Sequence, residues 1–592
     1  MKDFFKSVLA TVVGVFISCI ILGLISTLIF FGFVAVVSNS ASSSAFTLKD
    51  NTVLTINLSG EMQDRVIENP LLQYLGLEEV NRIALTDVLS AIKKAKNDDK
   101  ISGIYIKSGY LSASSASLNE IRKELESFKT SGKFIVAYAD DYLQGCYFLT
   151  SLADKVILNP QGSVDLHGLA LQRTFYKDLL DKIGVEMQVF KVGTYKSAVE
   201  PYMLDKMSDA NREQVTSYAN DMWLSMLTKI SSSRNISMER LNLLADTLPL
   251  FRGSDFAIEN HLIDTLMYET EVKKYLKSLL DVKESDDLNT ASVSEILSVP
   301  STEKSKSKDK VAVLYAEGSI VSGNEKTDIN DRYLIKQIGK LQDNEDIKAV
   351  VFRVNSPGGS AYASEQIWKA ISDLKEKKPV IVSMGDYAAS GGYYISCNAS
   401  KIYAQPNTLT GSIGIFGMFP NVSGLTNKIG LKFDHVKTNK MSDFGDVSRP
   451  MNDDEKAILQ AYIEKGYDLF LTRCSEGRNI PKDSLDRIAQ GRVWTGKQAL
   501  GLGLVDALGG IDDAVKDAAR MAELEDYSVS EYPRKITIWE TFLNVNQEEI
   551  ASRIVKEYIG EDFELVKTIK EIRNLKEQDF IQARMPYDLE VK

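Results

Sequence analysis

The chain has 592 residues, of which 44% are hydrophobic and 26% are charged. This length exceeds what one hydrophobic core serves, and the apolar fraction suits several packed units. The 70 basic and 81 acidic residues give a net charge of −11, which argues against nucleic acid as the main partner. The four cysteines share no metal-ligand or disulfide spacing, and we expect neither a metal site nor a cofactor.

Residues 1–48 have the pattern of a membrane anchor. Lys2 and Lys6 precede a stretch, Ser7–Leu48, that has no charged residue and consists mostly of Val, Ile, Leu and Phe. A helix needs about 20 apolar residues to cross a bilayer, so one span fits within Val8–Val37. The two lysines favour a cytoplasmic N-terminus, with the body on the other side of the membrane.

A cleaved signal peptide is the alternative interpretation of this segment. Ser40–Ala45 is rich in small residues and resembles a cleavage region. The apolar run is longer than the stretch of about 7–15 residues that is typical of a signal peptide, and this length favours the anchor.

Two diverged copies of one unit make up most of the remaining chain. Residues 52–280 and 310–525 align, with a shift of 246 positions from Ile135 and Ile381 through Gly184 and Gly430. The register then slips by two, so that Arg234 meets Arg478. Chance does not produce so many matches in one register. Further pairs at the same shift are Val136 with Val382, Asp140 with Asp386, Tyr147 with Tyr393, Pro160 with Pro406 and Gly168 with Gly414.

The composition of the segments between and after the copies completes the division into domains. Polar and charged residues predominate in 281–309, which predicts a linker. Apolar residues at helical spacing in Ile536–Tyr558 and Phe563–Leu575 predict tail helices that pack on the body or on another subunit. The expected domains are the anchor (1–48), a first unit (49–280), the linker (281–309), a second unit (310–525) and a C-terminal helical tail (526–592).

Each copy begins with a strand, and amphipathic helices then alternate with apolar strands. The opening strands are Val53–Leu58 and Val311–Tyr315, and each ends shortly before a glycine. Within the first copy, the helical pattern Leu85–Ala95 leads to the apolar strand Ile101–Ile106. Such alternation predicts βαβ units on a largely parallel sheet, so we expect an α/β fold in both copies.

Ser390 stands in the sequence Ala389-Ser-Gly-Gly-Tyr-Tyr394, between an apolar strand, Val380–Val382, and a predicted helix. This pattern is typical of a nucleophile at a strand-to-helix turn. Free backbone N–H groups at the start of the helix favour a developing negative charge, and the small neighbours leave room for a substrate. A small-residue helix start that only packs against a strand is the alternative interpretation.

The two copies differ where the chemistry is expected. Gln144 occupies the position of Ser390, and Ser112-Ala113 occupies the position of Gly358-Gly359. In the second copy, Pro357-Gly-Gly follows a strand and lets backbone N–H groups approach an oxyanion, although an ordinary loop has the same composition. The loss of both features from the same copy favours the functional interpretation.

A serine nucleophile needs a base, and histidine is the usual one. The only histidines are His167, His261 and His435, and none lies in a stretch that resembles the Ser390 or Pro357-Gly-Gly loops. A lysine serves as a base when desolvation holds it neutral. Lys196 lies among Tyr195, Ala198 and Val199 in the first copy and is the candidate, although most lysines are solvated surface charges.

These features resemble the signal peptide peptidase A family, also called protease IV, in its long tandem-repeat bacterial form. The resemblance covers nearly the whole chain, including the anchor. It implies two tandem Clp-protease/crotonase-like units with mainly parallel sheets behind one transmembrane helix. The motifs that carry it are Tyr195–Pro201, Asn355–Gly359, Ala389–Tyr394 and Thr410–Gly414.

The resemblance also implies the site and its chemistry. Because each copy keeps one of the two reactive residues, a Ser/Lys dyad would form between the copies. The site residues implied are Ser390 as nucleophile, Lys196 as general base, Gly359 and Gly391 as the oxyanion hole, and Gly358 and Ser412 as substrate-binding residues.

The function implied is that of a membrane-anchored serine endopeptidase that degrades released signal peptides. It would lie in the bacterial inner membrane with a periplasmic body, and would assemble as a homo-oligomer, a tetramer as in the family. Two other classes stay open. A crotonase-like acyl-CoA enzyme shares the fold and an oxyanion hole but needs no Ser/Lys pair or anchor, and a membrane scaffold needs no reactive serine.

Overall fold

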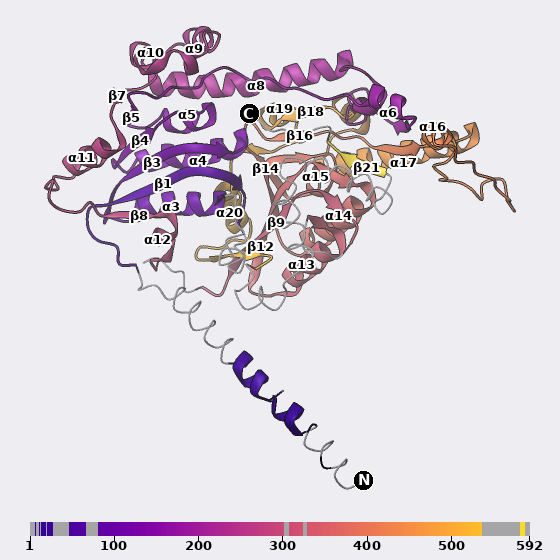
Figure 1. Ribbon diagram of the computed structural model, residues 1–592, viewed down its shortest axis with the longest axis horizontal. Coiled ribbons are helices and arrows are strands. Elements are labelled where there is room, and N and C mark those ends of the chain that lie inside the picture. The colour runs from indigo at the N-terminus through magenta and orange to yellow at the C-terminus, as the bar shows by residue number, and fades with distance from the viewer. Residues whose placement is uncertain are drawn as a thin grey trace.

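A computed structural model describes residues 6, 11, 13–18, 20–27, 46–66, 81–300, 307–323, 328–534 and 581–585 of the protein. These residues form three β-sheets with helices packed around them (Figure 1). Two of the sheets have the same strand order, and the third joins segments from distant parts of the sequence.

The first sheet belongs to the first half of the chain. Its order is β2-β1-β3-β4-β5-β7, with β8 paired to β1 on the edge opposite β3, and all its strand pairs are parallel. Its central strands are buried, as parallel strands covered by helices must be. The strands are β1 (Thr52–Gln63), β2 (Arg82–Ala84), β3 (Ile101–Ser112), β4 (Phe134–Ala139), β5 (Lys155–Leu158), β7 (Thr265–Leu266) and β8 (Thr290–Ser292).

The second sheet repeats this order in the second half of the chain. The series β20-β9-β12-β14-β15-β19 corresponds strand by strand to β8-β1-β3-β4-β5-β7. Two further strands, β16 and β18, extend it beside β14. Its strands are β9 (Lys310–Glu317), β12 (Ile347–Ser356), β14 (Val380–Ala389), β15 (Lys401–Ala404), β16 (Leu409–Gly411), β18 (Val493–Thr495), β19 (Ala507–Leu508) and β20 (Ser528–Tyr532).

The helices repeat as well. The two longest, α8 and α17, both have 26 residues and end at an asparagine in the left-handed conformation, Asn235 and Asn479. Asparagine tolerates this conformation better than most residues, so both helices stop at the same point of the repeat. The paired helices are α3 (Leu85–Asn97) with α13 (Asp331–Asp343), α4 (Ser115–Lys129) with α14 (Ala361–Lys375), α5 (Gln144–Thr150) with α15 (Gly391–Ser396), α8 (Asp209–Arg234) with α17 (Asp453–Arg478), α9 (Met238–Ala245) with α18 (Lys482–Ile488), α10 (Gly253–Glu259) with α19 (Gly496–Gly501), and α11 (Glu269–Leu279) with α20 (Ile511–Met521). The predicted α/β fold with mainly parallel sheets is therefore confirmed.

The third sheet connects the two halves. Its order is β11-β10-β13-β21-β17-β6, and β6 of the first half lies antiparallel to β17 of the second. Backbone pairing along all of β6 fixes where the chain after it must run. The strands are β6 (Glu186–Lys191), β10 (Ile320–Val321), β11 (Ile329–Asn330), β13 (Gly358–Ser360), β17 (Phe416–Asn421) and β21 (Ile581–Arg584).

The structure differs from the expected linker and helical tail. The segment 281–309 contains β8 and a short helix, α12 (Val293–Ser298), and it packs on the first sheet through the buried side chains of Ala291 and Ile296. These apolar residues are too few to stand out from the polar composition around them. The tail contains the strands β20 and β21, whereas the predicted helices in 536–558 and 563–575 lie outside the described residues.

Part of the predicted membrane span, including 28–37, also lies outside the described residues. Residues 13–18 and 20–27 are helical and exposed. No helix formed by the described residues is both long and apolar enough to cross a bilayer.

A buried cluster of charged side chains joins the two halves at β12 of the second sheet. Arg353 on β12 binds both carboxylate oxygens of Asp64, at 2.9 and 3.0 Å, and one oxygen of Glu120 on α4, at 3.1 Å. All three side chains are at most 5% exposed. Burial raises the pKa of Glu120 and the Arg353 charge lowers it, so the cluster depends on the guanidinium. Two carboxylates of the first half thus share one cation of the second.

Replacing Arg353 by methionine should lower the free energy of unfolding by about 3–5 kcal/mol, because both carboxylates then stay buried without a cation. Chemical denaturation of the full chain measures this loss. Lys348→Met is the control, since Lys348 lies on the same strand but pairs with Asp309 at the surface, and it should cost under about 1 kcal/mol. Equal losses for the two variants would show that the cluster does not stabilise the fold.

Candidate active site

Ser390 lies between the end of β14 and the start of α15 and is fully buried. Its backbone has φ 55° and ψ −113°, a conformation that residues with a Cβ rarely adopt. Hydrogen bonds hold it there: its N–H donates to the Gly411 carbonyl at 2.8 Å, and its carbonyl accepts from the Tyr394 N–H. The surrounding structure therefore imposes a strained turn on this serine.

Lys196 reaches the same place from the first half of the chain. It follows β6, and the Tyr195 N–H donates to the Gln490 carbonyl at 2.9 Å, which fixes the segment against the second half. A Cβ on Gly491 would lie 2.7 Å from the Lys196 Cα, so only glycine permits this close approach. The Lys196 side chain is fully buried, with its Nζ 5.9 Å from the centre of the Phe416 ring.

The two side chains meet. Lys196 Nζ lies 2.9 Å from Ser390 Oγ, and it lies 3.2 Å from both the carbonyl oxygen and the hydroxyl of Ser412. A neutral amine has two protons and one lone pair. If Ser412 accepts both protons, the lone pair is left to face the Ser390 hydroxyl. Ser412 therefore orients the amine.

Burial lowers the pKa of Lys196 well below its usual range, and desolvation is the cause. Within the described residues no carboxylate forms an ion pair with this amine, because the three groups that it contacts are all uncharged. A carboxylate at this position would raise the pKa again. The surroundings thus favour the neutral form, which is the form that accepts a proton.

The histidines lie elsewhere. His167 Nδ1 contacts Asp165 at 2.6 Å, and His435 Nε2 contacts Asp446 at 3.1 Å. His261 forms part of a turn and has φ 57°. The hydrogen bonds of Ser390 in the described structure involve Lys196 and backbone groups.

Two glycine amides converge beside Ser390. A Cβ on Gly391 would lie 3.1 Å from the Gly359 nitrogen, and a Cβ on Gly358 would lie 2.8 Å from the Gly391 nitrogen. Gly358 has φ 101°, which only glycine adopts without strain. A carbonyl oxygen, that of Ala583 on β21, lies 2.2 Å from the Cβ position on Gly358 and 3.0 Å from that on Gly391. The nitrogens of Gly359 and Gly391 and the carbonyl oxygen of Ala583 therefore lie close together beside Ser390.

The structure brings together all six residues that the sequence singled out, but it changes the surroundings of two. Ser412 is fully buried against Lys196, where we expected contact with substrate, and Gly358 pairs with Arg584 of β21. Sequence reasoning missed the Gln490-Gly491 turn and β21. The positive φ of 78° at Gly491 leaves no signal in the sequence beyond the glycine itself.

In the first half, the Gln144 side chain occupies the position that corresponds to Ser390. Gln144 Oε1 accepts hydrogen bonds from the N–H groups of His167 and Gly168, at 2.9 and 3.0 Å, and its Nε2 donates to the Gly168 carbonyl. Gly168 corresponds to Gly414 in the repeat. The amide of Gln144 thus satisfies backbone groups of a turn that in the second half borders Ser390.

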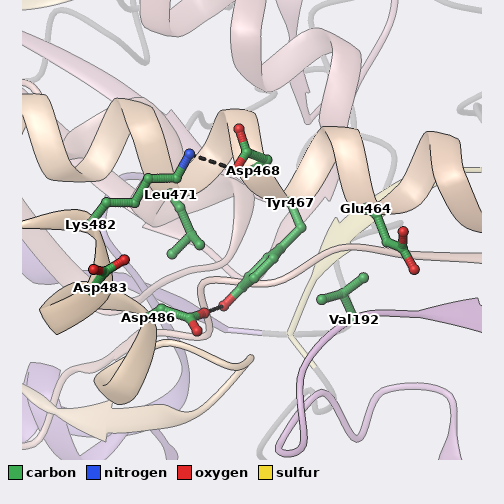
Figure 2. A pocket seen from close by; sticks show the side chains of 8 residues that line it. All are labelled: Val192, Glu464, Tyr467, Asp468, Leu471, Lys482, Asp483 and Asp486. Carbon is green, nitrogen blue, oxygen red and sulfur yellow. Dashed lines mark hydrogen bonds and ion pairs between the residues drawn. The ribbon is translucent and has the colours of Figure 1, made fainter.

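An open cavity of about 280 Å³ lies away from these residues, between α17 and α18 (Figure 2). Its lining includes Val192, Tyr467 and Lys482, and Lys482 donates to Asp468 across it at 2.5 Å. Neither Ser390 nor Lys196 contributes to its lining. The place beside Ser390 is instead filled by β21.

Burial of the Lys196 amine makes the free energy of unfolding depend on pH. Below about pH 10.4, the pKa of a free lysine, the unfolded chain binds a proton at Lys196 more readily than the folded chain does. The Lys196→Met variant should therefore be more stable than wild type at neutral pH, and its advantage should shrink as the pH rises towards 10.4. Denaturant titrations at several pH values measure the difference. Lys428→Met, at an exposed lysine, is the control for the loss of a charge. If the gain in unfolding free energy of Lys196→Met were the same at about pH 6 and about pH 10, burial of a neutral amine would be contradicted.

Comparison with known proteins gives the family. The description of peptidase family S49 matches residues 127–283 and 372–525, one match in each half, and that of Clp protease matches residues 302–410. Protease 4 of Haemophilus influenzae is 35% identical over 94% of this chain and 95% of its own length. Protease 4 of Salmonella typhi is 37% identical over 82% of this chain and 81% of its own.

A shorter relative covers part of the chain. A putative signal peptide peptidase SppA of Enterococcus faecium is 32% identical over 40% of this chain and 70% of its own length. Both halves match the same family description and share one strand order, so the chain is a tandem repeat. The chain therefore belongs to peptidase family S49 and is a serine-type peptidase.

Proposed function

We propose that the protein is a membrane-anchored endopeptidase that uses a Ser390/Lys196 dyad to degrade signal peptides left in the membrane after their release. The observation that supports the dyad most directly is the 2.9 Å approach of the buried Lys196 Nζ to Ser390 Oγ. The absence of an ion-pair partner for Lys196 among the described residues supports its role as a base.

In the proposed reaction, neutral Lys196 takes the proton of Ser390 as Oγ attacks the carbonyl carbon of a peptide bond. The amine is then charged, and it gives the proton to the nitrogen of the departing chain. The contacts of Lys196 with Ser412 keep the amine in place while its charge changes. A water molecule, deprotonated by the same lysine, hydrolyses the acyl-enzyme and restores Ser390.

The negative charge of the intermediate would fall on the carbonyl oxygen. The nitrogens of Gly359 and Gly391 lie close together beside Ser390, and we assign their N–H groups as the oxyanion hole. An oxyanion-hole donor typically contributes about 3–4 kcal/mol to the stability of the transition state. Gly358 and Gly391 have no space for a side chain, which explains why the loop and the turn need glycine here.

The sheet around the site suits an extended peptide. The strand β21 pairs with β13 on one side and β17 on the other. A peptide in the place of β21 would pair with both strands, with alternate side chains in pockets, as in peptide recognition by strand addition. The name of the Enterococcus faecium relative supports signal peptides as substrates. An anchor within residues 1–48 would hold the site at the membrane surface, where such peptides are concentrated. We further propose assembly as a homo-oligomer, with the tetramer as the expected form.

The dyad predicts the behaviour of variants at Ser390. Ser390→Ala and Ser390→Gly should both lose at least about a thousandfold in turnover of an apolar peptide, because neither has a nucleophile. Their stabilities should differ, since Ser390→Gly relieves the positive φ of 55° and should be about 1 kcal/mol more stable than Ser390→Ala. Peptide hydrolysis and denaturation of the full chain in detergent measure the two effects.

Lys196→Arg tests the base in the same assay. A guanidinium does not release its proton in a protein, so this variant should be as inactive as Ser390→Ala. Wild-type turnover should rise with pH as Lys196 loses its proton, at a pH well below that of a free lysine, because burial lowers its pKa. Near-normal turnover by Lys196→Arg would refute the assignment of the base.

The anchor predicts a topology. In intact spheroplasts, protease added outside should digest the body, and the mature chain should retain the apolar run Ser7–Leu48. Immunoblotting and N-terminal sequencing measure these outcomes. Protection of the body would place it in the cytoplasm, and a mature N-terminus near Ala45 would show that the segment is a cleaved signal peptide.

A further inference from the structure

The strand β14 is irregular just before it reaches Ser390. Its pairing with β12 changes register between Met384 and Ala388, so that the three residues Gly385–Tyr387 lie opposite the single residue Asn355. These three residues are called the bulge below. The neighbour of β14 on its other side also changes at the bulge, from β15 before it to β16 after it. A bulge bends its strand and re-aims the residues that follow, so the place of Ser390 depends on it.

Side chains of the second half hold the two ends of the bulge. Asn355 Oδ1 accepts a hydrogen bond from the Tyr387 N–H at 3.1 Å. The Thr408 hydroxyl donates to the Gly385 carbonyl at 2.7 Å. Both ends are therefore fixed from within the half that carries Ser390.

Asp386, the middle residue of the bulge, binds the other half of the chain. Its Oδ1 accepts from the Ser117 N–H at 3.0 Å, from the Ser117 hydroxyl at 2.8 Å and from the Ser114 hydroxyl. Both serines lie at the start of α4 (Figure 1). Its Oδ2 faces Nδ2 of Asn355 at 3.5 Å. All the hydrogen bonds from the first half thus fall on one oxygen of this carboxylate.

The repeat shows that this contact replaces an ordinary helix cap. Ser114 before α4 corresponds to Ser360 before α14. The Ser360 hydroxyl accepts from the Ala363 N–H at 3.2 Å, as a capping serine does. Ser114 forms no such bond, and the equivalent N–H, that of Ser117, donates to Asp386 instead. A carboxylate is favoured at the start of a helix, where N–H groups are free, so β14 caps α4.

The hydrogen bonds from α4 also decide how well the carboxylate is satisfied. Burial raises the pKa of Asp386, as does the charge of Asp64, whereas the hydrogen bonds from Ser114 and Ser117 lower it. The charge of Arg353 lowers it as well, but that guanidinium binds other carboxylates. The groups that bind Asp386 directly are therefore those of α4.

The equivalent aspartate of the first half lies in a different setting. Asp140 aligns with Asp386, but β4 ends one residue before it, and the pairing of β3 with β4 is regular. Its carboxylate accepts from the Tyr138 hydroxyl at 2.6 Å and from the Asn159 amide at 2.9 Å, both in its own half. Within the described residues, the bulge and its contact with the other half thus belong to the half that carries the serine.

We propose that Asp386 is a positioning residue, which holds the bulge of β14 against the start of α4 and so sets where Ser390 Oγ lies relative to Lys196 Nζ. This inference rests on the proposed function of Ser390 and Lys196. The hydrogen bonds of Asp386 involve neither of them, and three residues separate it from Ser390. A residue with a strained backbone keeps its place only when its surroundings impose it, as Ser390 requires.

The test is hydrolysis of an apolar peptide by the full chain in detergent, with kcat and KM measured separately. Asp386→Ala should lower kcat about 10–100-fold and leave KM within about twofold, because the nucleophile moves while the substrate groove stays. Asp386→Asn should keep kcat within about threefold of wild type, since an amide oxygen accepts the same hydrogen bonds and asparagine caps helices as aspartate does. Asp140→Ala is the matched control and should leave both constants unchanged.

Ser117→Ala tests the contact from the first half, and it decides the matter if Asp386→Ala does not fold. It should lower kcat about threefold or more with KM unchanged. Added to Asp386→Ala it should cost little more, because both changes remove one contact. Losses in kcat that multiply would overturn the proposal, as would an equal loss for Asp140→Ala or a raised KM with kcat unchanged.

Ser390→Ala in the same assay separates the two proposals. If it is inactive while Asp386→Ala and Ser117→Ala both keep the wild-type kcat, the positioning role is wrong and the proposed function stands. If Ser390→Ala keeps the wild-type turnover, the proposed function fails, and the positioning role fails with it.

Discussion

The contact between Lys196 and Ser390 is the constraint on which the arrangement of this protein depends. A lysine has to be uncharged to accept a proton, and burial without a carboxylate is what makes it so. Burial in turn requires close packing of segments from both halves, as where Gly491 lies against the backbone of Lys196. The pairing of β6 with β17 supplies this packing. A site assembled in this way forms only when both halves have folded and docked.

The repeat has two halves, and the two residues of the proposed dyad lie in different halves. Both halves keep the same strand order, and their long helices α8 and α17 have the same length, although only one half contains Ser390. In the first half, the Gln144 amide satisfies the turn at Gly168, which would otherwise be left with unpaired backbone groups. In the second half, Ser442, which the repeat aligns with Lys196, lies exposed in a loop. In the proposed dyad each half supplies one reactive residue, and the ion cluster of Arg353 joins the two halves.

The third sheet differs from the two repeated sheets in the origin and direction of its strands. Its strands come from both halves and from the end of the chain, and it includes antiparallel pairs that the repeat does not contain. The strand β21 lies beside Ser390, whereas the open cavity between α17 and α18 lies away from it (Figure 2). The candidate site is therefore marked by burial and hydrogen bonding and not by this cavity.

The sequence by itself determined the local features. Alternating apolar strands and amphipathic helices predicted the parallel α/β units, the shift of 246 positions revealed the repeat, and the small residues around Ser390 marked the turn. These features depend on neighbours along the chain, which a sequence pattern records. The family resemblance predicted the Ser390–Lys196 pair, and the tertiary structure brings the two side chains together across 194 positions. Only the tertiary structure decided that Ser412 contacts the amine and that the strand β21 lies beside Gly359. Such contacts follow from how sheets pair and pack, and no local periodicity encodes them.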